Sequence, residues 1–159
     1  MAVSALQIYA GERARLILRE RGLRPEDVGV VAAAAGGPKG LVLNRLDRFI
    51  FGQWLRRGGI VHLLGASIGA WRMACAAHGD ADRALAELAD DYIHQRYEHA
   101  PGRPPSPRHV SETLGATLER RLTERAPALL AHPRYRLHVF TSRGRGMLGR
   151  DGRVRTLLG

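Results

Sequence analysis

Two short apolar stretches, residues 28–35 and 60–64, dominate the hydrophobic pattern, and each ends in a glycine-bearing turn. Short continuous apolar runs are typical of strands buried in a parallel sheet. A helix-favouring segment follows each turn: residues 43–54 place an apolar side chain at every third or fourth position, and residues 70–77 are mostly small or apolar. Strand, tight turn and helix therefore follow one another twice, which predicts an α/β fold.

The remaining segments predict further helices and one more strand. A helix-like pattern covers about residues 6–21, and the run at residues 136–142 indicates a third strand. Asp80 and Ser111 are placed to cap two later helices, whereas the proline-rich residues 101–107 predict a surface loop. The apolar stripes of those two helices consist of Ala81, Ala84, Leu85, Leu88 and Tyr92 in one and Leu114, Leu118 and Leu122 in the other.

The length of 159 residues and a hydrophobic content of 45% fit one domain with a sizeable core, and we expect residues 1–159 to form a single domain. Residues 146–157 read as two short strands joined by Asp151 and Gly152. An Asp-Gly pair between short strands is a strong hairpin signal, so we expect a C-terminal β-hairpin.

The second glycine turn has the form Gly-x-Ser-x-Gly, with Gly65 and Gly69 on either side of Ser67. In a nucleophile elbow, such glycines leave room for neighbouring backbones around a serine held in a strained bend between a strand and a helix. The order of elements around Ser67 fits this arrangement. Ser67 is therefore the candidate nucleophile, with its Oγ exposed at the end of the strand.

The first glycine turn, residues 36–40, allows several interpretations. It is not a P-loop, because its lysine precedes the last glycine and Leu41 offers no hydroxyl to magnesium. A dinucleotide site is disfavoured because the glycine spacing does not match and residues 54–58 hold no carboxylate. Two interpretations remain: a strand-to-helix loop with Pro38 in the first helical turn, and an oxyanion hole whose N–H groups bind a tetrahedral acyl intermediate.

The two turns together resemble those of the patatin-like phospholipase family, in its bacterial branch. Members carry a glycine-rich oxyanion loop and, a few tens of residues later, a Gly-x-Ser-x-Gly elbow. Here Ala35 stands at the loop's first glycine, and the similarity is most specific over residues 28–77. The bacterial form of the elbow is present as Gly65-Ala66-Ser67-Ile68-Gly69-Ala70-Trp71-Arg72.

This resemblance implies a three-layer sandwich with a mostly parallel sheet and helices on both faces. It also implies a serine acyl hydrolase that cleaves lipid or phospholipid acyl esters through an acyl-serine intermediate, without a metal or cofactor. Pro38 has no N–H to donate. The oxyanion hole that the resemblance implies consists of Gly36, Gly37, Lys39 and Gly40.

The family pairs its serine with an aspartate, which lies in an Asp-Gly-Gly or Asp-Gly-Ala motif far downstream. No such motif occurs in this chain. The sole Asp-Gly after Ser67 is at Asp151, 84 positions later, and Arg153 follows it. Asp151 is thus a candidate base that reads better as a turn residue. We expect the catalytic aspartate to be missing and the chain to be the N-terminal part of a longer domain.

Two alternatives stay open. A Ser-His-Asp esterase or acyltransferase would use the same elbow and would place a histidine within hydrogen-bond reach of Ser67. A non-catalytic remnant of the fold would bind lipid without cleaving it. The histidines considered for the first alternative are His94, His99, His109, His132 and His138.

Composition and charge indicate which binding partners and which cellular location to expect. The net charge is +10, but the basic residues are scattered and almost all arginine, with Lys39 the one lysine, and no nucleic-acid-binding motif accompanies them. We expect a lipid or acyl-ester substrate, peripheral contact with an anionic membrane surface, and no nucleic acid. The single cysteine, Cys75, reads as a core residue. No apolar run suits a signal peptide or a membrane span, so a cytoplasmic location is expected.

Overall fold

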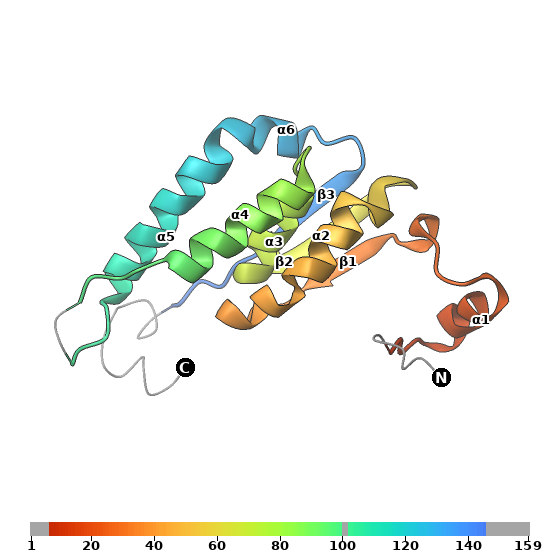
Figure 1. The fold of residues 1–159 in the computed structure, drawn as a ribbon, viewed down its shortest axis with the longest axis horizontal. Helices are drawn as coiled ribbons and strands as arrows, with labels where there is room; N and C mark the ends of the chain where they lie inside the picture. The colour runs from red at the N-terminus through yellow and green to blue at the C-terminus, as the bar shows by residue number, and fades with distance from the viewer. Residues whose placement is uncertain (1–6, 100–101, 146–159) are drawn as a thin grey trace.

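The computed structural model describes residues 7–99 and 102–145 and has an α/β fold around a parallel sheet (Figure 1). Three strands lie in the order β1 (Val30–Ala33), β2 (Val61–Ala66) and β3 (Tyr135–Phe140). Both strand pairs are parallel, with Ala33 opposite Gly65 and Ala66 opposite Phe140. The three predicted strands are therefore confirmed within a few residues, and the carboxyl ends of β1 and β2 meet at one edge.

Helices connect and cover these strands. In chain order they are α1 (Glu12–Arg21), α2 (Asn44–Gly52), α3 (Ile68–Ala76), α4 (Ala81–His94), α5 (Pro107–Leu122) and α6 (Ala126–Leu130). Short 3-10 turns occur at η1 (Pro25–Asp27), η2 (Gly37–Leu43), η3 (Trp54–Arg56) and η4 (Thr123–Arg125). The glycine loop thus leads through η2 into α2, and the elbow leads directly into α3.

The helix starts confirm one predicted cap and correct another. The Asp80 side chain accepts a hydrogen bond from the Arg83 N–H at 3.1 Å, as expected for the residue that begins α4. Ser111, however, lies inside α5, and the cap is Ser106, whose Oγ accepts from the His109 N–H at 3.2 Å. Proline suits the first helical position, so Pro107 begins the helix instead of ending the loop.

The first helix is shorter than its pattern predicts. It begins at Glu12, six positions later than expected, and none of its residues is buried. Because short helices depend on a packed face for most of their stability, a segment without such a face forms fewer turns. In Figure 1, α1 stands apart from the sheet.

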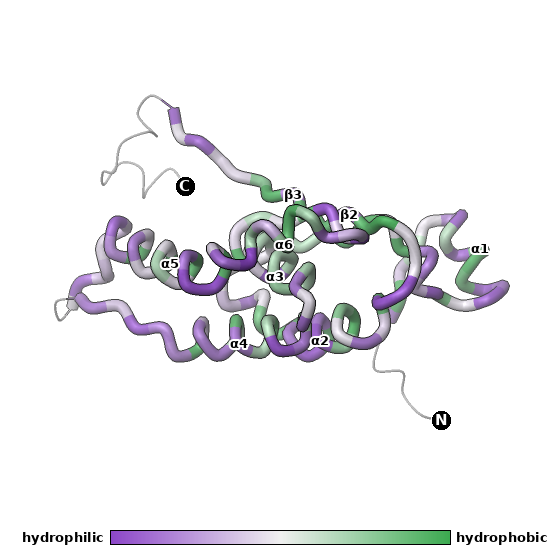
Figure 2. The backbone as a smooth tube through the Cα atoms, turned by 90° about the horizontal axis from the view of Figure 1, so that it is seen from above, coloured by the Kyte–Doolittle hydropathy of each residue, from purple (hydrophilic) through white to green (hydrophobic). Residues whose placement is uncertain are grey.

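The core lies between one face of the sheet and helices α2, α3 and α4. Val61 and Leu63 of β2 are fully buried there with Leu55, Met73 and Leu85. In Figure 2 the strands lie along one side of the molecule, and α3, α4 and α2 lie on the other. The Asp80-capped helix buries Ala81, Ala84, Leu85 and Leu88, as its stripe predicts.

The opposite sheet face is exposed in the described part of the chain. Val30 and Phe140 keep 55% and 60% of their surface accessible, and His62 and His138 are exposed between them. The second helical layer expected for a three-layer sandwich is not found among residues 7–99 and 102–145. The predicted hairpin at residues 146–157, including Asp151, lies outside the described residues. No described helix is both long and apolar enough to cross a membrane.

Candidate active site

Ser67 occupies a strained backbone conformation between the end of β2 and the start of α3. Its φ of 51° and ψ of −128° make it the one non-glycine residue with positive φ in the described part of the chain. Such conformations cost about 1–3 kcal/mol and persist where the surrounding structure enforces them, commonly at functional sites. Ser67 is exposed, whereas Ile68, Gly69 and Ala70 after it are buried. The hydroxyl therefore stands at the surface of a rigid corner, as the elbow motif predicts.

The two glycines of the motif are required by close backbone contacts. A Cβ on Gly65 would lie 2.5 Å from Ala70 Cα, where the first turn of α3 folds back over the end of β2. A Cβ on Gly69 would lie 2.1 Å from the Ala33 carbonyl oxygen and 2.8 Å from that of Ala34. Real Cβ atoms do not approach so closely, so any side chain at either position would push α3 away from the sheet.

The same contacts bring the two glycine turns together at one sheet edge. Gly69 touches the end of β1, from which the chain enters the first turn. Further along that turn, a Cβ on Gly40 would lie 3.0 Å from Cγ2 of Ile68, the residue after Ser67. The predicted neighbourhood of loop and elbow is thus present: the first turn packs against the helix start that carries Ser67.

The hydrogen bonds within the glycine loop show which of its N–H groups are free to bind a substrate oxygen. The Lys39 N–H donates to the Gly36 carbonyl oxygen at 3.3 Å, closing the first 3-10 turn. Gly37 has a φ of +53°, a left-handed conformation that glycine adopts readily. Among the described residues, the N–H groups of Gly36 and Gly37 have no hydrogen-bond partner. Of the expected oxyanion donors, Gly36 and Gly37 therefore remain available, Lys39 is engaged inside the loop, and Gly40 lies within η2, where it packs against Ile68.

The start of α3 contributes a donor that our sequence analysis missed. The N–H groups of Ala70 and Trp71 both donate to the Ser67 carbonyl oxygen, at 2.9 and 3.3 Å. The Ile68 N–H precedes them and has no partner in the described part of the chain. In enzymes with an elbow, the residue after the nucleophile commonly supplies one oxyanion-hole N–H, and the helix dipole adds partial positive charge. The position of Ile68 directly after Ser67 was the signal available in the sequence.

No base for Ser67 is found among residues 7–99 and 102–145, where its hydroxyl makes no hydrogen bond. The predicted candidate Asp151 lies outside the described residues. Four of the five candidate histidines make their hydrogen bonds elsewhere: His94 to the Asp90 carbonyl, His109 to the Glu98 N–H, His132 to the N–H groups of Arg134 and Tyr135, and His138 to His62.

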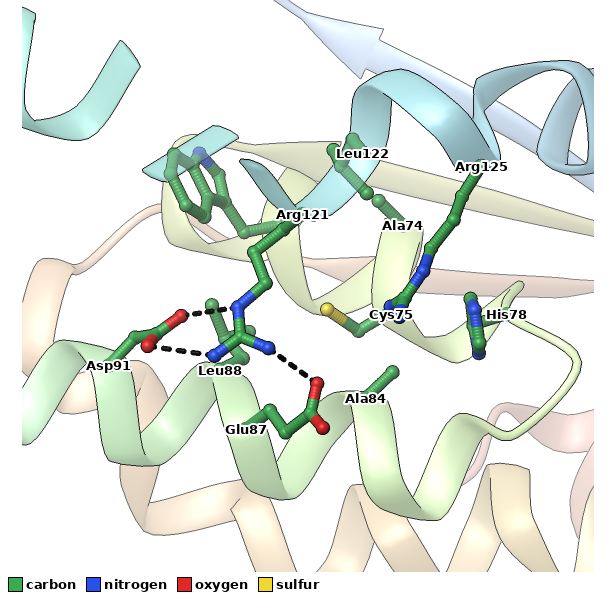
Figure 3. A pocket seen from close by; sticks show the side chains of 11 residues that line it. Ala74, Cys75, His78, Ala84, Glu87, Leu88, Asp91, Arg121, Leu122 and Arg125 are labelled. Carbon is green, nitrogen blue, oxygen red and sulfur yellow. Dashed lines mark hydrogen bonds and ion pairs between the residues drawn. The ribbon is translucent and has the colours of Figure 1, made fainter. Parts of the chain in front are cut away.

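The pocket beside α3 in Figure 3 is too small to hold a lipid chain. It lies between α3, α4 and α5, and its interior volume is about 20 Å³, on the scale of a single water molecule. Arg121 closes one side by donating to Asp91 at 2.7 and 2.8 Å and to Glu87 at 2.5 Å. Cys75 lies at this pocket, and burial raises the pKa of its thiol to about 12, so the reactive thiolate form is disfavoured at neutral pH.

Comparison with protein-family models, with curated proteins and with solved structures found no match to this chain.

Proposed function

We propose that this chain carries the nucleophile and oxyanion hole of a patatin-like serine acyl hydrolase that cleaves lipid or phospholipid acyl esters. The observation that carries the proposal is the conformation of Ser67, an exposed serine with φ of 51° between two glycines that cannot bear a side chain. The proposal includes the family's three-layer sandwich, in which a further helical layer covers the sheet face that bears Val30 and Phe140.

The proposed chemistry follows from the donors around Ser67. Ser67 Oγ attacks the ester carbonyl carbon while its proton passes to a carboxylate base. The carbonyl oxygen becomes negative and accepts hydrogen bonds from the free N–H groups of Gly37 and Ile68. The carbon–oxygen bond to the alcohol then breaks, and the alcohol leaves with the proton held by the base. Water attacks the acyl-serine in turn, gives a proton to the base and releases the fatty acid as Ser67 Oγ regains its proton.

The base is the part of this scheme that the described residues do not supply. The proposal assigns it to an aspartate, with Asp151 as the candidate in this chain. A non-catalytic lipid-binding module is the second candidate function, and the observation that favours it is the lack of any hydrogen bond to the Ser67 hydroxyl in the described residues.

The surface next to the loop suits a lipid substrate. Val42 in η2 keeps 83% of its surface accessible, and the basic residues Lys39 and Arg45 on either side of it are exposed. An apolar side chain flanked by positive charges can insert among lipid headgroups while the charges contact anionic lipid. We therefore include peripheral contact with an anionic membrane in the proposal and place it at this turn.

Reaction with a fluorophosphonate probe tests the proposal, because the probe labels serines that an active site makes nucleophilic. We expect labelling of the protein that disappears in Ser67→Ala and persists in Ser111→Ala, an exposed serine in α5. Hydrolysis of p-nitrophenyl esters of increasing chain length then measures turnover. No labelling of the folded protein, together with retained binding to lipid vesicles, would support the non-catalytic module instead.

A further inference from the structure

Asp47 and Arg72 form an ion pair that is buried between α2 and α3. Arg72 Nε donates to one carboxylate oxygen at 2.6 Å and Nη2 donates to the other at 2.9 Å. Asp47 is 5% exposed and Arg72 is 7% exposed, and they are the two buried charged residues in the described part of the chain. The guanidinium and carboxylate planes therefore meet in a fixed, two-bond geometry.

The pair joins the two helices that begin at the candidate site. Asp47 is in the first turn of α2, which continues from the glycine loop through η2. Arg72 is the fifth residue of α3, which begins directly after Ser67. The Arg72 stem also reaches the loop itself, because a Cβ on Gly40 would lie 3.5 Å from Arg72 Cδ and 3.0 Å from Ile68 Cγ2. The glycine loop therefore packs on the same part of α3 that the ion pair connects to α2.

Stability alone gives little reason for such a pair. Removing two charges from water is costly, and apolar residues of similar size in the same place are often equally stabilising or better. The two helices already share an apolar core that includes Phe51 and Met73. What a bidentate pair adds over apolar packing is direction, because both hydrogen bonds form only at one mutual orientation of the helices.

We propose that Asp47 and Arg72 are positioning residues that fix the glycine loop relative to Ser67. This inference rests on the proposed function, because it gives the pair the task of aiming the N–H groups of Gly37 and Ile68 at one oxygen atom. Neither side chain takes part in the proton transfers; they act through the backbone of the two elements they connect. A misplacement of about 1 Å at such a site lowers reaction rates by up to about a hundredfold.

The chain provides a matched control for this pair. Arg48, the residue after Asp47, makes a second bidentate ion pair with Asp82 of α4, at 2.8 and 3.0 Å. This second pair also involves α2 and consists of the same two chemical groups. Its side chains, however, are 39% and 46% exposed, and α4 does not carry Ser67.

The experiment tests the buried pair with two variants, Arg72→Lys and the double variant Asp47→Leu/Arg72→Met. The matched controls alter the exposed pair in the same way: Arg48→Lys and the double variant Asp82→Leu/Arg48→Met. For each, the melting temperature and the second-order rate constant of Ser67 labelling by the fluorophosphonate are measured. We expect labelling to fall about tenfold or more in both Arg72 variants and less than twofold in both controls. Equal rates in the Arg72 variants and the controls would overturn the proposal, as would a loss that merely follows the fraction of unfolded protein.

Amide hydrogen exchange separates a failure of this inference from a failure of the proposed function. The Lys39 N–H is hydrogen-bonded within the loop and reports its order even if Ser67 is never labelled. We expect faster exchange across residues 36–44 in Arg72→Lys, beyond what its lower global unfolding free energy accounts for, and no change in Arg48→Lys. Unchanged exchange in Arg72→Lys would overturn the proposal, and so would a failure of Arg72→Lys to fold, because the pair would then be required for stability.

Discussion

Gly69 lies so close to Ala33 that a Cβ at position 69 would stand 2.1 Å from the Ala33 carbonyl oxygen. This contact joins the start of α3 to the end of β1, and so joins the elbow to the entrance of the glycine loop. It explains why a glycine follows Ser67 by two positions: the helix that supports the serine must lie directly on the neighbouring strand.

Gly69→Ala is therefore expected to be strongly destabilising. The clash is with backbone that cannot rotate away, so the cost should reach at least about 3 kcal/mol, the upper end of overpacking effects. Gly115 in α5 is the control, because a Cβ there would have no atom within 4 Å and alanine favours helix by about 0.5–1 kcal/mol. Urea unfolding measures both. Similar stabilities for the two variants would contradict the close contact at Gly69.

Substitutions at Ser67 should show the cost of its backbone conformation. Ser67→Gly relieves strain of about 1–3 kcal/mol and loses about 0.5–1 kcal/mol through the greater freedom of glycine in the unfolded chain. Ser67→Ala keeps the strain. We expect the glycine variant to be more stable than the alanine variant by about 1 kcal/mol in thermal unfolding, with labelling abolished in both. A less stable glycine variant would show that position 67 is not strained.

Contact with anionic lipid should depend on the turn around Val42. In the Ser67→Ala background, which prevents hydrolysis, binding to phosphatidylglycerol vesicles, measured by sedimentation, should weaken about thirtyfold in Lys39→Glu, since each unit of charge contributes about 1 kcal/mol and the substitution changes the charge by two units. Val42→Glu should weaken it at least tenfold, because an inserted valine contributes about 1.5 kcal/mol and the added carboxylate is repelled by anionic lipid. Leu130→Glu, at a residue of α6 that is 86% exposed, is the control. Equal binding by all three would place membrane contact elsewhere or exclude it.

Cys75 should react slowly in the folded protein. Because burial raises its pKa from about 9 to about 12, the thiol is protonated in the folded state at pH 8, and a disulfide reagent should react with it more slowly than with the unfolded chain. Between pH 9 and pH 12 the unfolded chain loses this proton while the folded chain keeps it, so stability should fall as the pH rises through that range. Thiol titration and melting temperatures from pH 8 to 11 measure both effects, and a Cys75→Ala variant should lose this part of the pH dependence. Rapid labelling at pH 8 would show that the thiol is accessible.

Features that depend on neighbouring residues were predictable from the sequence. The elbow is such a case, because the backbone contacts of Gly65 and the bend at Ser67 lie within a few positions of each other. The loop's hydrogen bonds were harder to predict from the sequence, because whether the Lys39 N–H faces outward or bonds to Gly36 depends on how the 3-10 turn closes. The serine that caps α5 was misplaced because the proline after Ser106 was interpreted as loop.

Features that depend on distant residues were not predictable. Asp47 and Arg72 are 25 positions apart on different helices, and nothing in either local pattern indicates that they meet. The exposure of His62 in the described part of the chain, by contrast, had a local signal, because a polar side chain in a strand points away from the core when its neighbours point into it.

The identity of the labelled residue tests the central claim most directly. Trypsin should release residues 58–72 as one peptide in which Ser67 is the sole serine, so tandem mass spectrometry of the fluorophosphonate-treated protein can locate the adduct. Our account predicts the adduct mass on Ser67 of this peptide in native protein and its absence after denaturation in urea. An adduct on another serine, or a peptide that stays unmodified in folded protein, would contradict the assignment of Ser67 as nucleophile.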